Sequence, residues 1–375
     1  MESEWKKKTI SDIAEINPRE KLPKGTIAKK VPMDALQPFT RDIPSFEINE
    51  YKGGAKFRNG DTIMARITPC LENGKTAQVR ILNEDEVAFG STEYIVFRAK
   101  ENTDADFLYY LICSPTVREA AIKSMVGSSG RQRVQKDVIA NLELSIPSYE
   151  EQKKIGQLLK ILDDKIQLNN SINKNLLQQA SSIYQAWFED FVLSDGSCPS
   201  DWSQGTLSDI ADITNGKRPP FKSSEKTDTA VIPLVGAASV MGYTTEANHT
   251  DKILVIGRVG THGVVQRFNS PCCTSDNTLV ITSDLYEYTF QILQRIDYHA
   301  MNRGSTQPLI TQEDMNKVSI LIPDKETLSN FENLVGQLMK QYEANLLENV
   351  KLAELRDTLL PRLMSGDLDV SLLDL

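Results

Sequence analysis

Two loops rich in Gly, Ser, Thr and Gln have the residue types that contact a phosphodiester backbone and its bases. The first runs Gly127-Ser-Ser-Gly-Arg-Gln-Arg-Val134 and the second Arg303-Gly-Ser-Thr-Gln-Pro-Leu-Ile310. Small residues let backbone amides approach a phosphate, while Arg can pair with guanine and Gln with adenine through two hydrogen bonds each. The candidate contacts in these loops are Ser128, Ser129, Arg131, Gln132, Arg133, Ser305, Thr306 and Gln307.

Further cationic and polar residues follow predicted strands or lie in polar loops. Arg66 and Arg258 end matching strand patterns, and the pairs Asn73 with Lys75 and Lys217 with Arg218 are expected to form mobile cationic tips. For any one of these residues, an ordinary solvated loop is the simpler interpretation. The repetition of the loops favours ligand contact. The remaining candidates are Arg66, Asn73, Lys75, Lys217, Arg218, Arg258 and Thr261.

Patterns that support covalent chemistry are missing from the sequence. Glu72-Asn-Gly-Lys-Thr76 resembles the end of a P-loop, but Pro69 stands where that pattern requires Gly, so a hairpin turn is the better interpretation. No Ser/His/Asp or Cys/His arrangement and no Gly-rich S-adenosylmethionine loop stands out. The five cysteines have no CxxC spacing and there are only three histidines. We therefore expect no catalysis, no cofactor and no metal site.

Composition is ordinary for a globular protein of two domains in a reducing cytosol. The chain has 375 residues, of which 40% are hydrophobic, and no apolar run long enough for a membrane span or signal peptide. We expect a cytoplasmic protein. The net charge of −9 argues against strong long-range steering to DNA, although a local basic face on each domain stays possible.

An internal repeat organises the chain. Residues 4–16 return at 201–213 with seven of thirteen identical, and three shorter matches follow in the same order. These pair 63–67 with 255–259, 91–96 with 275–280 and 141–147 with 317–323. The chain is therefore predicted to be one module, a long helix, a second copy of the module and a second long helix.

Each module has a mixed α/β pattern. Short β-branched runs predict strands at 61–67, 76–82, 94–97 and 142–146, and at 252–259, 264–268, 279–282 and 318–322. One amphipathic helix per module is expected at 106–114 and 286–296. A short helical turn near each module start is expected to be capped by Ser11 or Ser208.

The two long helices show coiled-coil spacing. Residues 150–187 place apolar residues in steps of three and four, interrupted by Asn169 and Asn173. The seam of the second helix, through Leu352, Leu355 and Leu359, is interrupted by Asn345 and Asn349. Antiparallel pairing would set the Asn pairs opposite each other. It would also bring Trp187 near Phe331 and Ile155 near Leu363.

The predicted fold is α+β, with two repeated modules joined by an antiparallel, pseudo-twofold helix pair. The expected ranges are 1–149 for the first module, 150–190 for the first helix, 196–324 for the second module, 325–363 for the second helix and 364–375 for a tail.

This organisation resembles the specificity subunit of Type I restriction–modification enzymes. The resemblance rests on the paired Trp-x₃-Thr openings, on Gly-Ser-Ser-Gly-Arg-Gln-Arg, on Ile146-Pro-Ser-Tyr-Glu-Glu-Gln-Lys153 and on the C-terminal stretch 355–370. One departure is Pro323-Asp-Lys-Glu, where the first module has Pro-Ser-Tyr-Glu-Glu-Gln.

The resemblance implies a non-catalytic subunit that recognises double-stranded DNA. Each module would be a target recognition domain for one half of an asymmetric, bipartite site, and the helices would set the spacer. Two methyltransferase subunits would dock there, and a separate ATP-dependent restriction subunit would translocate and cleave. Two alternatives remain. One is a coiled-coil scaffold without DNA binding, and the other is a chain with catalysis of its own, against which the missing motifs argue.

Overall fold

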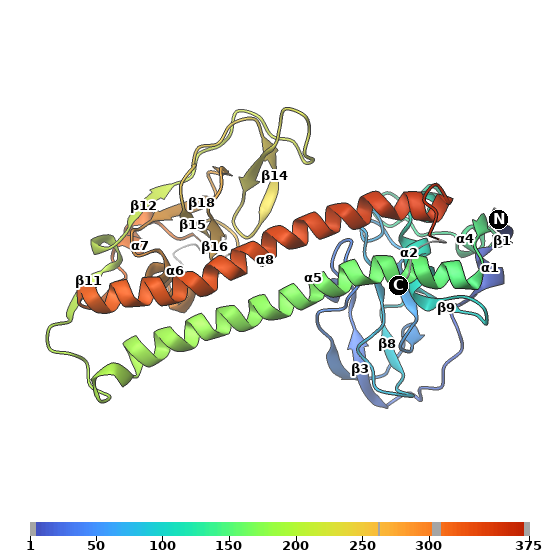
Figure 1. Ribbon diagram of the computed structural model, residues 1–375, viewed down its shortest axis with the longest axis horizontal. Coiled ribbons are helices and arrows are strands. Elements are labelled where there is room, and N and C mark those ends of the chain that lie inside the picture. Colours follow the sequence, from blue (N-terminus) through green and yellow to red (C-terminus); the bar gives the residue numbers. More distant parts are fainter. Residues whose placement is uncertain (1–4, 262, 302–308, 371–375) are drawn as a thin grey trace. The chain divides into compact units, whose positions relative to one another are not determined.

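The computed structural model describes residues 5–261, 263–301 and 309–370. Its internal contacts form two compact units. Unit 1 comprises residues 1–171 and 346–375, and unit 2 comprises residues 172–345. Each unit therefore combines one module with a segment of both long helices, α5 (Tyr149–Tyr184) and α8 (Lys325–Ser365) (Figure 1).

Unit 1 contains two four-stranded sheets and a two-stranded ribbon. The first sheet is antiparallel, in the order β2 (Ala14–Ile16), β9 (Tyr94–Ala99), β6 (Thr62–Ala65), β7 (Thr76–Gln78). The second has the order β4 (Glu47–Glu50), β3 (Ile27–Val31), β8 (Ala88–Gly90), β5 (Lys56–Phe57), with β3 and β8 parallel. The ribbon pairs β1 (Lys6–Thr9) with β10 (Glu143–Ile146). The helices are α1 (Ile10–Ile13), η1 (Met33–Ala35), α2 (Ala105–Cys113), α3 (Pro115–Lys123) and α4 (Lys136–Ala140).

Unit 2 repeats this topology with fewer strands. Its antiparallel sheet has the order β12 (Asp212–Asn215), β18 (Thr278–Thr282), β15 (Ile253–Gly257), β16 (Gln266–Phe268). A three-stranded sheet follows the order β14 (Val240–Thr244), β13 (Ile232–Val235), β17 (Cys273–Thr274), and the ribbon pairs β11 (Ser203–Thr206) with β19 (Ser319–Ile322). Strands β13 and β17 are parallel, as β3 and β8 are in unit 1. The helical elements are η2 (Gln185–Glu189), a π-helical turn, and η3 (Val192–Ser194), η4 (Leu207–Asp209), α6 (Tyr286–Arg295) and α7 (Gln312–Asn316).

The predicted repeat of α/β modules and the packing of two long helices are confirmed. The strands predicted by β-branched runs are present, most of them shorter than predicted, although β9 and β18 are longer. The two amphipathic helices are α2 and α6. The predicted caps are wrong. Thr9 and Thr206 occupy the cap positions, where each forms a capping box with the aspartate three residues later, Asp12 or Asp209.

Within each unit the segments of α5 and α8 run antiparallel, because higher residue numbers in α5 face lower numbers in α8. In unit 2 Asn345 Nδ2 donates to Asn173 Oδ1 at 2.8 Å. Trp187 lies with its ring centroid 5.9 Å from that of Phe331. In unit 1 Asn169 Nδ2 donates to Asn349 Oδ1 at 2.9 Å. Ile155 and Leu363 of this unit belong to one buried core cluster.

The predicted seam of α8 is wrong at Leu355, whose side chain is 47% exposed. Arg356 is buried instead, and its Nη1 donates to Asp163 of α5 at 2.7 Å. Asp163 also accepts a hydrogen bond from Tyr110 of α2, so both its oxygens have partners. A buried charge is tolerated when it is paired and hydrogen-bonded, and here the pair joins the module to both helices of unit 1.

Unit 2 joins its module to α8 through different charges. Arg267 of β16 donates to both oxygens of Glu287, at 2.6 and 2.8 Å, and to Glu343 of α8 at 3.1 Å. Glu332 of α8 accepts from the backbone N–H groups of Glu287 and Tyr288, at 3.1 and 2.8 Å. A carboxylate is stabilising at a helix N-terminus, so Glu332 takes the role of a cap for α6.

Candidate nucleic-acid interface

In unit 1 the first Gly/Ser/Gln/Arg loop folds against the end of β6. The N–H of Arg66 donates to the carbonyl of Glu93 at 2.9 Å, and the N–H of Val134 donates to the carbonyl of Arg66 at 2.9 Å. The N–H of Thr68 donates to the carbonyl of Gln132 at 3.0 Å. These backbone bonds bring the candidates Arg66, Gln132 and Arg133 together at one end of the sheet.

Glu93 lies between two of these arginines. Its carboxylate accepts from Arg66 Nε at 3.0 Å, and from Arg133 Nη2 at 2.7 Å and Nε at 3.0 Å. The hydrogen bond from Arg133 is the main cause that lowers the pKa of Glu93, so this carboxylate is ionised at neutral pH. The three side chains form a trio with a net charge of +1.

The rest of this loop is open to solvent. Ser128, Ser129 and Arg131 are exposed, and the N–H of Arg131 donates to the carbonyl of Ser128 at 3.0 Å in a tight turn. Gly130 has a φ of +77°, a conformation that side chains rarely adopt. The turn therefore holds small residues and one cation where a phosphate could approach.

The residue pair Asn73 and Lys75 does not form the expected mobile tip. Asn73 is exposed, but Lys75 is partly buried and its Nζ donates to the carbonyl of Met33 at 2.9 Å. This hydrogen bond makes Lys75 a structural donor within unit 1.

A hollow of about 600 Å³ beside Arg66 contains cations that the sequence analysis missed. Its lining includes Asn17, Arg19, Lys56, Arg66, Thr92 and Tyr94. Arg19 is exposed, whereas Lys56 is tied to the carbonyl of Glu20 at 2.6 Å. Neither residue lies in a repeated loop, so no sequence signal singled it out. Arg19 therefore joins the candidates for phosphate contact.

Unit 2 builds the same backbone frame around Arg258. The N–H of Arg258 donates to the carbonyl of Asn277 at 2.8 Å, and the N–H of Ile310 donates to the carbonyl of Arg258 at 3.0 Å. Val259 and Leu309 form the bridge that corresponds to Ile67 and Arg133 in unit 1. Arg258, at the end of β15, thus occupies the position that Arg66 has at the end of β6.

The cationic pair Lys217 and Arg218 lies at the same end of the sheet as Arg258. Asn215 pairs with Leu279 and Gly257 with Thr278, so the ends of β12 and β15 flank the start of β18. Both side chains of the pair are exposed, as is Thr261. The candidates Ser305, Thr306 and Gln307 lie outside the described residues.

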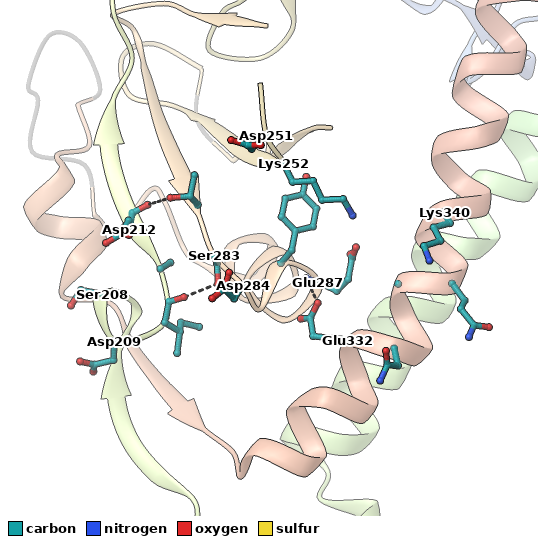
Figure 2. Close-up of a pocket in the computed structure, with 17 residues that line it drawn as sticks. Ser208, Asp209, Asp212, Asp251, Lys252, Ser283, Asp284, Glu287, Glu332 and Lys340 are labelled. Atoms are coloured by element: carbon teal, nitrogen blue, oxygen red, sulfur yellow. Dashed lines mark hydrogen bonds between the residues drawn. The ribbon is translucent and has the colours of Figure 1, made fainter. Parts of the chain in front are cut away.

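Unit 2 also has a hollow, of about 850 Å³, and its lining is mainly acidic, unlike the hollow beside Arg66 in unit 1 (Figure 2). Asp209, Asp212, Asp251 and Asp284 line it, together with Glu287 and Glu332, against the cations Lys252 and Lys340. This lining disfavours a phosphate backbone. Burial raises the pKa of Glu332 to about 6, although the amides of Tyr288 and Glu287 act in the opposite direction.

Across 5–261, 263–301 and 309–370, no group of three or more His, Cys, Asp or Glu side chains has a geometry that could hold a metal ion. In the described part of the chain, no helix combines the length and apolar character needed to span a bilayer.

Known proteins share this organisation. The chain is 23% identical to the HindI specificity subunit of Haemophilus influenzae, a Type I restriction enzyme subunit, over 98% of the chain and 100% of the relative. It is 25% identical to the MjaIX specificity subunit of Methanocaldococcus jannaschii, over 72% and 71%. The crystal structure of the S subunit of a Type I restriction–modification system from M. genitalium has the same fold, with a TM-score of 0.57 at 17% identity over 97% of this chain and 96% of that chain.

The family assignment rests on both halves of the chain. Residues 2–178 and 199–356 each match the Type I restriction modification DNA specificity domain. The two matched ranges correspond to the two repeats that the sequence shows and to the two module topologies. The chain therefore belongs to the specificity-subunit family of Type I restriction–modification systems.

Proposed function

We propose that this chain is the non-catalytic DNA-recognition subunit of a cytoplasmic Type I restriction–modification complex. Each unit reads one half of a bipartite, asymmetric site in double-stranded DNA. The long helices α5 and α8 set the spacer between the half-sites. Two methyltransferase subunits dock on this chain and modify adenine, and ATP-dependent restriction subunits complete the complex.

The observation that carries this proposal is that the same backbone frame, a matching set of backbone hydrogen bonds, surrounds one arginine in each unit. Arg66 and Arg258 follow equivalent strands and have equivalent backbone partners, and exposed cations lie beside each. The side chains around the two arginines differ, with Glu93 and Arg133 in unit 1 and Asn277 and Leu309 in unit 2. Equivalent frames with different side chains suit two readers of unlike half-sites.

The scaffold alternative is tested by salt dependence. The full chain, assembled with its modification subunits, is titrated with duplex DNA at several salt concentrations. Contacts to phosphates release counterions, so the logarithm of the binding constant should fall linearly with the logarithm of salt concentration. DNA binding that is absent, or that is insensitive to salt, contradicts the proposed function and favours a scaffold.

A further inference from the structure

The two arginines that contact Glu93 use their nitrogens differently. Arg133 donates Nε and Nη2 to Glu93, and its Nη1 donates to the carbonyl of Arg131 at 3.4 Å, so all three nitrogens have a protein partner. Arg66 donates only Nε to Glu93. Within the described part of the chain, the two terminal amino groups of Arg66 have no protein partner.

The free end of Arg66 matches the acceptors of guanine. Two coplanar N–H groups can donate to O6 and N7 in the major groove, the commonest specific contact between protein and DNA. The hydrogen bond from Arg66 Nε to Glu93 restricts rotation of the guanidinium and so fixes its plane. A side chain that is already ordered loses less entropy on binding than a mobile one.

Arg133 also neutralises the charge of Glu93, which would otherwise oppose DNA binding. A bare carboxylate at Glu93 would repel the phosphates of an approaching duplex. Arg133 covers that carboxylate with hydrogen bonds from its Nε and Nη2. The Arg133 side chain is 44% exposed and that of Glu93 is 21% exposed. The trio keeps a net positive charge while Glu93 holds Arg66.

We infer that Arg66 reads a guanine in the half-site of unit 1, that Glu93 determines this specificity by orienting Arg66, and that Arg133 is a positioning residue. This inference rests on the proposed function and revises the role expected for Arg133 as a base contact. Unit 2 has Asn277 and Leu309 in the equivalent places, so the arrangement belongs to one half-site alone.

The test uses the full chain in complex with its modification subunits and duplex DNA in which every position of both half-sites is randomised. Bound molecules are sequenced for the wild type and for Arg66→Ala, Arg66→Lys, Glu93→Gln and Arg133→Ala. The first two variants should lower the preference for one guanine on the order of 10- to 100-fold. Glu93→Gln and Arg133→Ala should relax that same position and no other.

The half-site of unit 2 is the internal control, since it should be selected unchanged by a folded variant. Arg66→Lys should keep the salt slope of the wild type while it loses the guanine preference, which separates reading from charge. An unchanged guanine preference in Arg66→Ala overturns the inference. Relaxation of a second position in Arg133→Ala also overturns it, because Arg133 would then read a base itself. If the wild type selects no sequence at all, the proposed function fails, and this inference fails with it.

Discussion

At the residue scale, the surroundings of a cation decide what it can contribute to DNA binding. Arg131 is exposed in a turn of small residues, whereas Lys75 is held by the carbonyl of Met33. Arg131→Ala should weaken binding and reduce the salt slope by about one. Lys75→Ala, the matched control, should leave that slope unchanged and lower the free energy of unfolding by about 1 kcal/mol. Equal slope changes in both variants would contradict this assignment of roles.

A pH dependence follows from Glu332 in unit 2. Burial raises its pKa to about 6 from an ordinary value of 4.5, so the folded state binds the proton more tightly than the unfolded state. The stability that protonation gives is complete below about pH 4.5 and is lost as the pH rises through about 6. The total change is at most about 2 kcal/mol.

Denaturant unfolding at several pH values measures this effect as the difference between the wild type and Glu332→Gln. A Trp5→Phe background leaves Trp187 and Trp202, both in unit 2, as the fluorescent reporters. The wild type should lose stability relative to the variant between about pH 4.5 and 6. A difference that stays constant across this window would show that Glu332 does not titrate there.

The sequence could indicate residue types that suit contact with DNA but could not show which of them lie together. Arg66 and Arg133 were visible because each lies in or beside a repeated loop. Glu93 lies in a repeated segment as well, but an acidic residue does not suggest DNA contact, and it is 27 residues from Arg66 and 40 from Arg133 along the chain. Its role depends on the antiparallel register of β6 and β9, which sets Glu93 beside the end of β6.

At the scale of elements, the long helices are held by polar contacts as well as apolar ones. Asn173 and Asn345 are 5% and 4% exposed and share a hydrogen bond of 2.8 Å. A double-mutant cycle with Asn173→Ala and Asn345→Ala should show a coupling of about 1 kcal/mol, because removal of either partner leaves a buried amide unsatisfied. The pair Asn170, which is exposed, and Asn349, which is half-buried, is the control and should couple more weakly. Equal coupling in both pairs would contradict a special role for burial.

Spacing predicted these helices better than it predicted their details. Apolar steps of three and four identified both helices and the polar positions in their contact. The same spacing placed Leu355 in the seam, where Arg356 is buried instead. Periodicity treats a charged residue as outward-facing. Arg356 is buried because Asp163, distant in the sequence, and the adjacent Asp357 both accept its hydrogen bonds.

At the scale of the whole molecule, the helices should act as a ruler for the DNA site. An insertion of seven residues into both α5, after Ser171, and α8, after Asn345, keeps the heptad register and adds about 10 Å of helix. At roughly 3.4 Å per base pair, the recognised spacer should lengthen by about three base pairs with both half-sites unchanged. A four-residue insertion in α5 alone breaks the register and is the control, expected to abolish recognition.

The central claim is that one chain reads two different half-sites at a fixed separation. The most direct measurement maps methylated adenines across the genome of cells that carry this chain with its modification subunits. We expect one asymmetric, bipartite motif with a constant spacer, and in Arg66→Ala cells a motif relaxed in one half only. Methylation without a bipartite motif, or a motif unchanged when this chain is deleted, would contradict the claim that this chain reads both half-sites.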